Sequence, residues 1–144
     1  MFTNVLVGVD GKANGRDAIA LASQLVDPNG RLTLANVHRD EPTMRAISHE
    51  LLEEERARAG VEAELLSIAS SSAARGLHEQ AEELATDLIV IGSCSRGALG
   101  RVMLGNDSRA SLDGAPCTVA IAIHGFAERP QASLSSTPSE GGSS

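Results

Sequence analysis

The sequence predicts an α/β domain built on an open, mostly parallel sheet with helices on both faces. The first observation is that short aliphatic runs alternate along the chain with helical stripes, which is typical of βαβ units. The second is that the runs at 5–9 and 88–91 are almost entirely aliphatic, as expected of parallel strands buried on both faces. With 144 residues, the chain fits one domain.

Five strands are predicted, at residues 5–9, 32–37, 61–68, 88–91 and 119–123, the last running from Val119 to Ile123. The first ends in Asp10-Gly11, a turn sequence. We expect residues 1–124 to form the domain. Residues 125–144 are rich in Ser, Pro and Gly and are predicted to form a disordered tail.

Three helices are predicted between the first four of these strands. The first has apolar residues at i, i+3, i+4 and i+7 from Ala18 to Leu25, with Asn14 as its expected N-cap and the turn at 27–30 as its stop. The second is expected from Pro42 to Gly60, and the third after a cap region at 70–72. In the second, we expect a buried face of Met44, Ile47 and Leu51, with Glu53, Glu54 and Glu55 near solvent; in the third, a stripe of Leu77, Ala81, Leu84 and Ala85.

Composition excludes several classes of function. The net charge of −7 disfavours binding to a nucleic-acid backbone, and a chain with two Phe, no Tyr and no Trp is a poor base-stacking platform. No segment is long or apolar enough for a membrane span, and the N-terminus does not resemble a signal peptide, so we expect a cytoplasmic protein. Cys94 and Cys117 lack CxxC spacing, and reduced thiols are expected.

The glycine-rich segment at 88–110 is the strongest candidate for chemistry. It reads LIVIGSCSRGALGRVMLGNDSRA and contains Gly92, Gly97, Gly100 and Gly105, followed by an expected short helix. Glycines let backbone N–H groups approach an anion, and a helix N-terminus adds partial positive charge. The segment is neither a Walker A loop nor a dinucleotide fingerprint. The alternative is that its glycines only relax a tight connection between strand and helix.

Four motifs make the chain resemble the universal stress protein family over residues 2–124: VLVGVDG at 5–11, NVH at 36–38, TDLIVIGS at 86–93 and LGNDSRASLDGAPCTVAIA at 104–122. The resemblance implies a five-stranded parallel sheet in the order 3-2-1-4-5, with ATP bound at the switch point between strands 1 and 4. It also implies a stress-associated regulatory role with little or no turnover, and a homodimer formed through the fifth strand.

The resemblance also implies which residues contact the nucleotide. Asp10 would lie near adenine and ribose, the Val37 backbone would contact adenine, and the ribose and phosphates would face a set formed by Gly92, Ser95, Gly97, Gly105 and Asn106. Asp10 has an equally simple interpretation as the cap of the turn after the first strand. Lys12 and Arg16 could assist the phosphates, although a solvated surface position is the simpler interpretation of each.

The glycine-rich segment departs from the family's nucleotide motif in three places. Ser95 stands where the motif has its second glycine, so Gly97 would restore a turn of different shape. Asn106 replaces a Ser or Thr and remains a good N-cap. Asp107 replaces an apolar residue in the first helical turn, where its carboxylate would repel phosphate. We therefore expect nucleotide binding weaker than that of members with the full motif.

Neither catalytic residues nor a metal site can be assigned from the sequence. His38, His49, His78 and His124 are dispersed and show no metal-ligand spacing. Cys94 lies near Arg96, where a reactive thiol is conceivable, but an incidental small residue is the simpler interpretation. Two alternatives to nucleotide binding stay open: a dimeric interaction module without a nucleotide, and a nucleotide hydrolase of low activity.

Overall fold

Five parallel strands form one sheet in the computed structural model, which describes residues 1–93, 95–96, 102–103 and 112–128. They are β1 (Phe2–Gly8), β2 (Val26–His38), β3 (Glu64–Ala69), β4 (Leu88–Gly92) and β7 (Thr118–Ala122), in the order β3-β2-β1-β4-β7. Because β7 is the fifth predicted strand, this is the predicted order 3-2-1-4-5. The predicted fold class is confirmed.

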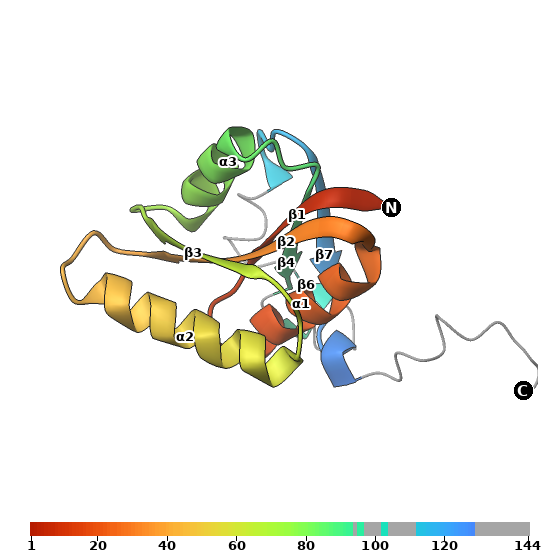
Figure 1. Cartoon of the computed structure of the whole chain (residues 1–144), viewed down its shortest axis with the longest axis horizontal. Coiled ribbons are helices and arrows are strands. Elements are labelled where there is room, and N and C mark those ends of the chain that lie inside the picture. The colour runs from red at the N-terminus through yellow and green to blue at the C-terminus, as the bar shows by residue number, and fades with distance from the viewer. Residues whose placement is uncertain (94, 97–101, 104–111, 129–144) are drawn as a thin grey trace, which may run out of the picture.

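Among the residues that the structure describes, three α-helices cover the two faces of the sheet (Figure 1). α1 (Ala13–Leu25) and α2 (Met44–Ala59) lie on one face, where Ile19 and Leu52 join a core with Val5 and Val7 of β1. α3 (Ala73–Glu83) lies on the other face, where Leu77 packs with the intervening residues of the strands. The central strands β1 and β4 are therefore buried on both sides, as their aliphatic sequences predicted.

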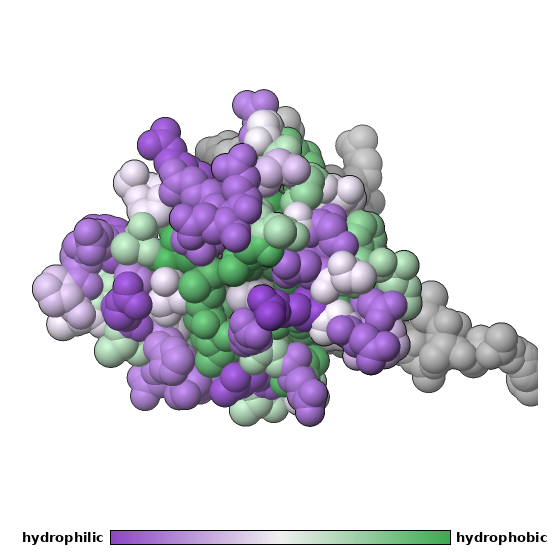
Figure 2. Space-filling model, turned by 45° about the horizontal axis from the view of Figure 1, so that its top comes forward, coloured by the Kyte–Doolittle hydropathy of each residue, from purple (hydrophilic) through white to green (hydrophobic). Residues whose placement is uncertain are grey.

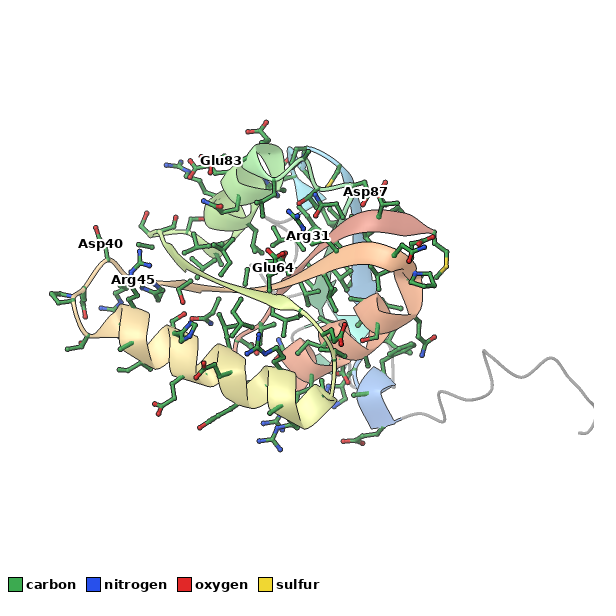
Figure 3. All side chains as sticks on the ribbon, viewed as in Figure 1. Arg31, Asp40, Arg45, Glu64, Glu83 and Asp87 are labelled. Carbon is green, nitrogen blue, oxygen red and sulfur yellow. The ribbon has the colours of Figure 1, made fainter. Side chains whose placement is uncertain are left out.

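The second and third strands differ in length from the prediction. β2 begins at Val26, directly after α1. Residues 27–30 therefore follow the end of α1, as predicted, but they lie within the strand, where its register with β1 is irregular. The Asp27 carboxylate accepts a hydrogen bond from Asn29 N (2.8 Å), which closes a local turn there. β3 begins three residues later than predicted and ends at Ala69. Arg31 of β2 and Glu64 of β3 form an ion pair of 3.5 Å between these strands (Figure 3).

The buried face of α2 is rotated from the predicted one. Its end at Gly60 is confirmed, because Gly60 adopts a φ of +67° and caps the last carbonyls. However, Ile47 is 53% exposed, and the buried residues are Ser48, Leu52 and Glu55. The expectation that Glu55 lies near solvent is wrong, because Arg16 of α1 neutralises its carboxylate inside the interface.

The helix starts show one confirmed cap and one correction. Ser72 caps α3, accepting a hydrogen bond from Arg75 N (3.3 Å), within the predicted cap region. α1 begins at Ala13 with Lys12 at the N-cap position, so Asn14 lies inside the first turn. α3 ends at Glu83, earlier than the predicted stripe, and Ala85 turns the chain with a φ of +56°.

Ordered structure continues past residue 124. A 3₁₀ turn, η1 (Phe126–Glu128), follows β7 and packs beside α1. The buried Asp17 of α1 accepts hydrogen bonds from Gly125 N (2.9 Å) and Ala127 N (2.8 Å). Residues 125–128 therefore belong with the domain; the rest of the predicted tail, 129–144, lies outside the described residues.

The glycine-rich segment contains a small ribbon of its own. β5 (Ser95–Arg96) and β6 (Val102–Met103) pair antiparallel in a small separate ribbon within the glycine-rich segment, which was not predicted. Figure 2 shows an apolar strip between α3 and α2, along β3, whose Leu65 and Leu66 are half-buried. Among the helices that the structure describes, none is both long and apolar enough to cross a membrane.

Candidate functional site

A cleft of about 420 Å³ opens at the carboxyl ends of the central strands. Its walls come from the ends of β1, β2 and β4 and from the starts of α1 and α3. Residues from all of these elements and from the turn after β1 line the cleft, among them Asp10, Lys12, Asn14, Gly15, Asn36, Val37, Ala73 and Gly92. β1 lies between β2 and β4, so the cleft is at the switch point of the sheet, where open α/β sheets bind ligands. Its volume is that of a small-molecule site.

The backbone N–H and C=O of Val37 lie on the β1 side of β2, beyond the last residue pair that joins β2 to β1. Val9 N donates to Ala35 O (2.8 Å), so Ala35 points its polar groups toward β1, whereas His38 O accepts from Ser70 N (2.9 Å) on the β3 side. Successive residues of a strand point their N–H and C=O to opposite edges, so Val37 faces the β1 side. The pairing with β1 ends at Ala35. Val37 therefore presents a donor and an acceptor to the cleft.

Asp10 stands at the cleft and also caps a turn. Its Oδ1 accepts a hydrogen bond from Lys12 N (2.9 Å), which is the turn-capping role considered from the sequence. The side chain is nevertheless exposed and belongs to the cleft wall. The two interpretations of Asp10 are therefore compatible.

Two residues of the cleft were missed from the sequence. Asn36 donates from Nδ2 to Val9 O (2.7 Å), which holds the chain leaving β1 against β2 as the cleft opens. Its position in the NVH motif beside Val37 could have indicated it. Asn14, expected as an N-cap, instead contributes to the wall. Lys12 lines the cleft, whereas Arg16 turns away and binds Glu55.

The glycines at the cleft are explained by close packing. A Cβ on Gly92 would lie 2.0 Å from Asn14 O, and one on Gly15 would lie 2.9 Å from Asp10 Oδ1. The first turn of α1 thus sits directly against the end of β4. Gly92 is needed to bring β4 and α1 together, whatever the cleft binds.

Of the predicted phosphate-binding set, Gly97, Gly105 and Asn106 lie outside the described residues. So do Cys94, the candidate reactive thiol, and Asp107, the residue expected to repel phosphate. Only the backbone of Ser95 is described, in β5, where it pairs with Met103. Thus the structure brings Asp10, Val37 and Gly92 to one cleft. Within the described ranges, no group of three or more His, Cys, Asp or Glu side chains is arranged to hold a metal ion.

Among the described residues, the two titratable groups with shifted pKa values, Asp87 and Cys117, lie at the opposite end of the sheet. Partial burial opposes ionisation of Asp87, but hydrogen bonds from Thr3 N, Asn4 N and the Thr3 hydroxyl outweigh it and lower the pKa of Asp87 (Figure 3). Burial and the nearby charge of Asp87 raise the pKa of the half-buried Cys117 thiol. Local burial, hydrogen bonds and charge thus account for both pKa shifts.

A family model described as the universal stress protein family matches residues 1–122. A universal stress protein solved in complex with cAMP is 24% identical, with a TM-score of 0.65, and the match covers 85% of this chain and 98% of that one. One from Archaeoglobus fulgidus is 17% identical, with a TM-score of 0.58 and coverage of 85% and 99%. One from Lactobacillus plantarum is 22% identical, with a TM-score of 0.53 and coverage of 83% and 97%. No curated protein sequence matches the chain.

Proposed function

Because the chain belongs to the universal stress protein family, we propose that it is a stress-associated regulatory protein that binds an adenine nucleotide, ATP, with little or no turnover. The binding site is the cleft between the ends of β1 and β4. One observation carries this proposal: the Val37 N–H and C=O face the cleft beyond the last pairing of β2 with β1.

The adenine ring occupies the side of the cleft formed by β2. One N–H and one C=O from the same residue match the adjacent acceptor and donor on the Watson–Crick edge of adenine. Guanine presents a different order of donors and acceptors on that edge, so the Val37 backbone favours adenine. The exposed carboxylate of Asp10, whose Oδ1 caps the turn at Lys12, accepts a hydrogen bond from a ribose hydroxyl at the rim of the cleft.

The phosphates extend toward α1 and the glycine-rich segment. From the family resemblance, we assign the phosphate contacts to Gly92, Ser95, Gly97, Gly105 and Asn106, of which the last three lie outside the described residues. Lys12 supplies a cation from the cleft wall, and the N-terminus of α1 adds partial positive charge.

The protein forms a homodimer through β7. This strand is at one edge of the sheet, and its aliphatic residues Val119 and Ile121 are only half-buried in the single chain. An exposed aliphatic edge strand is prone to pair with another strand. Antiparallel pairing of two β7 strands across a two-fold axis covers both edges. Light scattering should therefore give twice 14.9 kDa, and Ile121→Lys should shift the population to monomer.

Calorimetric titration with ATP, cAMP and GTP tests the nucleotide site. cAMP is included because one structural relative was solved with it. ATP should bind more tightly than GTP. The variant Ala73→Leu adds bulk to the cleft wall at the start of α3 and should weaken ATP binding by about tenfold or more. Ala57→Leu, at an exposed position of α2 away from the cleft, is the matched control and should leave binding unchanged.

Three outcomes would change the proposal. Equal affinity for ATP and GTP would contradict base recognition by Val37. An absence of binding at millimolar nucleotide, with the dimer intact, would favour the interaction module. Phosphate released steadily over hours, and lost in Ala73→Leu but retained in Ala57→Leu, would favour a slow hydrolase.

A further inference from the structure

The outer edge of β3 is open to another strand. β3 is the last strand of the sheet on the side opposite β7, and no strand among the described residues pairs with its outer edge. Exposed edges are normally protected by charged residues, proline or a bulge. Residues 65–69, with the sequence LLSIA, contain neither charge nor proline, and their register with β2 is regular. The apolar strip in Figure 2 runs along this unprotected strand.

Three residues of β3 direct their backbone groups outward. Ser70 N donates to His38 O of β2 (2.9 Å). Because successive residues of a strand point to opposite edges, Leu65, Ser67 and Ala69 turn their N–H and C=O away from β2. These three positions are symmetric about Ser67. An antiparallel pair of two β3 strands centred on Ser67 therefore uses all three outward residues of both copies, and a shift of the centre by one residue leaves some of them unpaired.

The same centre matches opposite charges on α2, which runs back alongside β3 (Figure 1). Ser48 of α2 donates to Ser67 Oγ (2.9 Å), so the next residue of the helix, His49, lies level with the centre. Arg45 and His49 line a groove of about 430 Å³ along the β3 edge. Glu53 lies 3.3 Å from His49 Nε2 and continues this row of side chains. Antiparallel pairing thus brings Arg45, one turn before His49, opposite Glu53 of the partner subunit, one turn after it.

The spacing of the layers suits the same pairing. α2 packs against both β2 and β3, so it lies above the space between them. Two α2 helices would then be separated by two strand spacings, about 10 Å, which is the usual distance between packed helices. On the other face of the sheet, the half-buried Leu66 comes opposite Ile68 of the partner subunit, as a close pair between hydrogen-bonded positions. Backbone, charges and apolar contacts therefore agree on one register.

We propose that the β3 edge binds the β3 edge of a second copy of this chain, antiparallel and centred on Ser67, with Arg45–Glu53 ion pairs between the two α2 helices. This interface is at the opposite edge of the sheet from β7, and it depends neither on the nucleotide site nor on the β7 dimer. A dimer formed through β7 keeps one free β3 edge at each end, so pairing at β3 joins dimers into tetramers and longer arrays. An interface limited to one strand and one helix face is small and weak, so these assemblies form only at high protein concentration.

Charge reversal in the full chain tests the interface by sedimentation equilibrium. The weight-average mass of the parent should rise between about 10 µM and about 1 mM protein. Arg45→Glu or Glu53→Arg, both at exposed positions, should weaken this association about tenfold or more, because like charges then face each other. An equimolar mixture of the two variants should regain the rise in mass, since each mixed pair again places opposite charges together. Glu54→Arg, the same charge change outside the row facing β3, is the matched control and should behave as the parent.

Two further variants separate the β3 edge from other causes of association. Ala69→Pro removes an outward N–H without removing a bond to β2, and should also reduce the rise in mass. Ile121→Lys, on β7, should lower the mass at low concentration but preserve the rise. The proposal is overturned if the parent keeps a constant mass over this range, if the mixture of charge variants shows no recovery, or if Ile121→Lys alone removes the rise. A rise that persists unchanged in Arg45→Glu, Glu53→Arg and Ala69→Pro would overturn it as well.

Discussion

Replacing Asp17 with Ala should release the C-terminal turn from α1 and destabilise the whole domain. The Asp17 side chain is 3% exposed, and its two oxygens accept from Gly125 N and Ala127 N at 2.9 and 2.8 Å. Hydrogen bonds to a charged group contribute about 1.5–3 kcal/mol each. Ala favours a helix interior over Asp by roughly 0.5 kcal/mol, which offsets part of the loss. Some hydration of the released N–H groups reduces it further, so we expect a loss of about 2–4 kcal/mol.

Urea denaturation and amide hydrogen exchange measure the two consequences separately. A loss of this size is a large fraction of a typical domain's stability of about 5–15 kcal/mol. The amides of Gly125 and Ala127 should exchange much faster in Asp17→Ala, and Asp17→Asn, which keeps one acceptor, should fall between it and the parent. Glu54→Ala, at an exposed position of α2, should change stability by less than about 0.5 kcal/mol. A loss below about 1 kcal/mol in Asp17→Ala, or unchanged exchange at Gly125 and Ala127, would refute the reasoning.

Three further predictions concern the nucleotide site and the opposite end of the sheet. Gly92→Ala should lose about 3 kcal/mol of stability in urea and weaken ATP binding, because the new Cβ would meet Asn14 O at 2.0 Å; a stable variant with normal binding would contradict this packing. Since the pKa of Asp87 is lowered from 3.8 in the folded state, its ionised form stabilises the protein above that value, and the contribution disappears as pH falls through the folded pKa. Asp87→Asn should thus be less stable than the parent at neutral pH, with the difference shrinking below about pH 4. Asp107→Val should bind ATP about five- to a hundredfold more tightly by calorimetry, with a gain that shrinks in added salt; an unchanged affinity would show that electrostatic repulsion is not the cause.

The sheet was predictable because its signal is local and repeated. Strands buried on both faces have to be aliphatic, and the runs around Val5 and Ile89 carry that requirement in the sequence itself. The α2 helix shows where this reasoning stops. Glu55 has the sequence signature of a solvated acid, but Arg16, distant in sequence, makes its burial favourable. Ile47 is exposed because Ser48 takes the inward position and bonds Ser67 of β3 at 2.9 Å.

The candidate site was predictable in part for a related reason. Asp10 follows β1, and Val37 lies near the end of β2. The parallel arrangement of the strands therefore brings both residues to the carboxyl end of the sheet. Asn14 and Asn36 were missed because their place in the cleft depends on how closely α1 approaches β4 and on where β1 leaves β2. These are properties of the assembled layers, and the sequence hints at them only through the position of Asn36 beside Val37 in the NVH motif.

The contact between Gly92 and Asn14 bears on how relatives of this chain can be sorted by sequence. Any protein with the same approach of α1 to β4 is expected to retain glycine at this position, including one that binds no ligand. Glycine there therefore carries no information for distinguishing nucleotide-binding members from the others. A classification of such proteins would do better to weight residues that the fold leaves free to vary, such as Lys12 at the rim of the cleft and Ala73 on its wall.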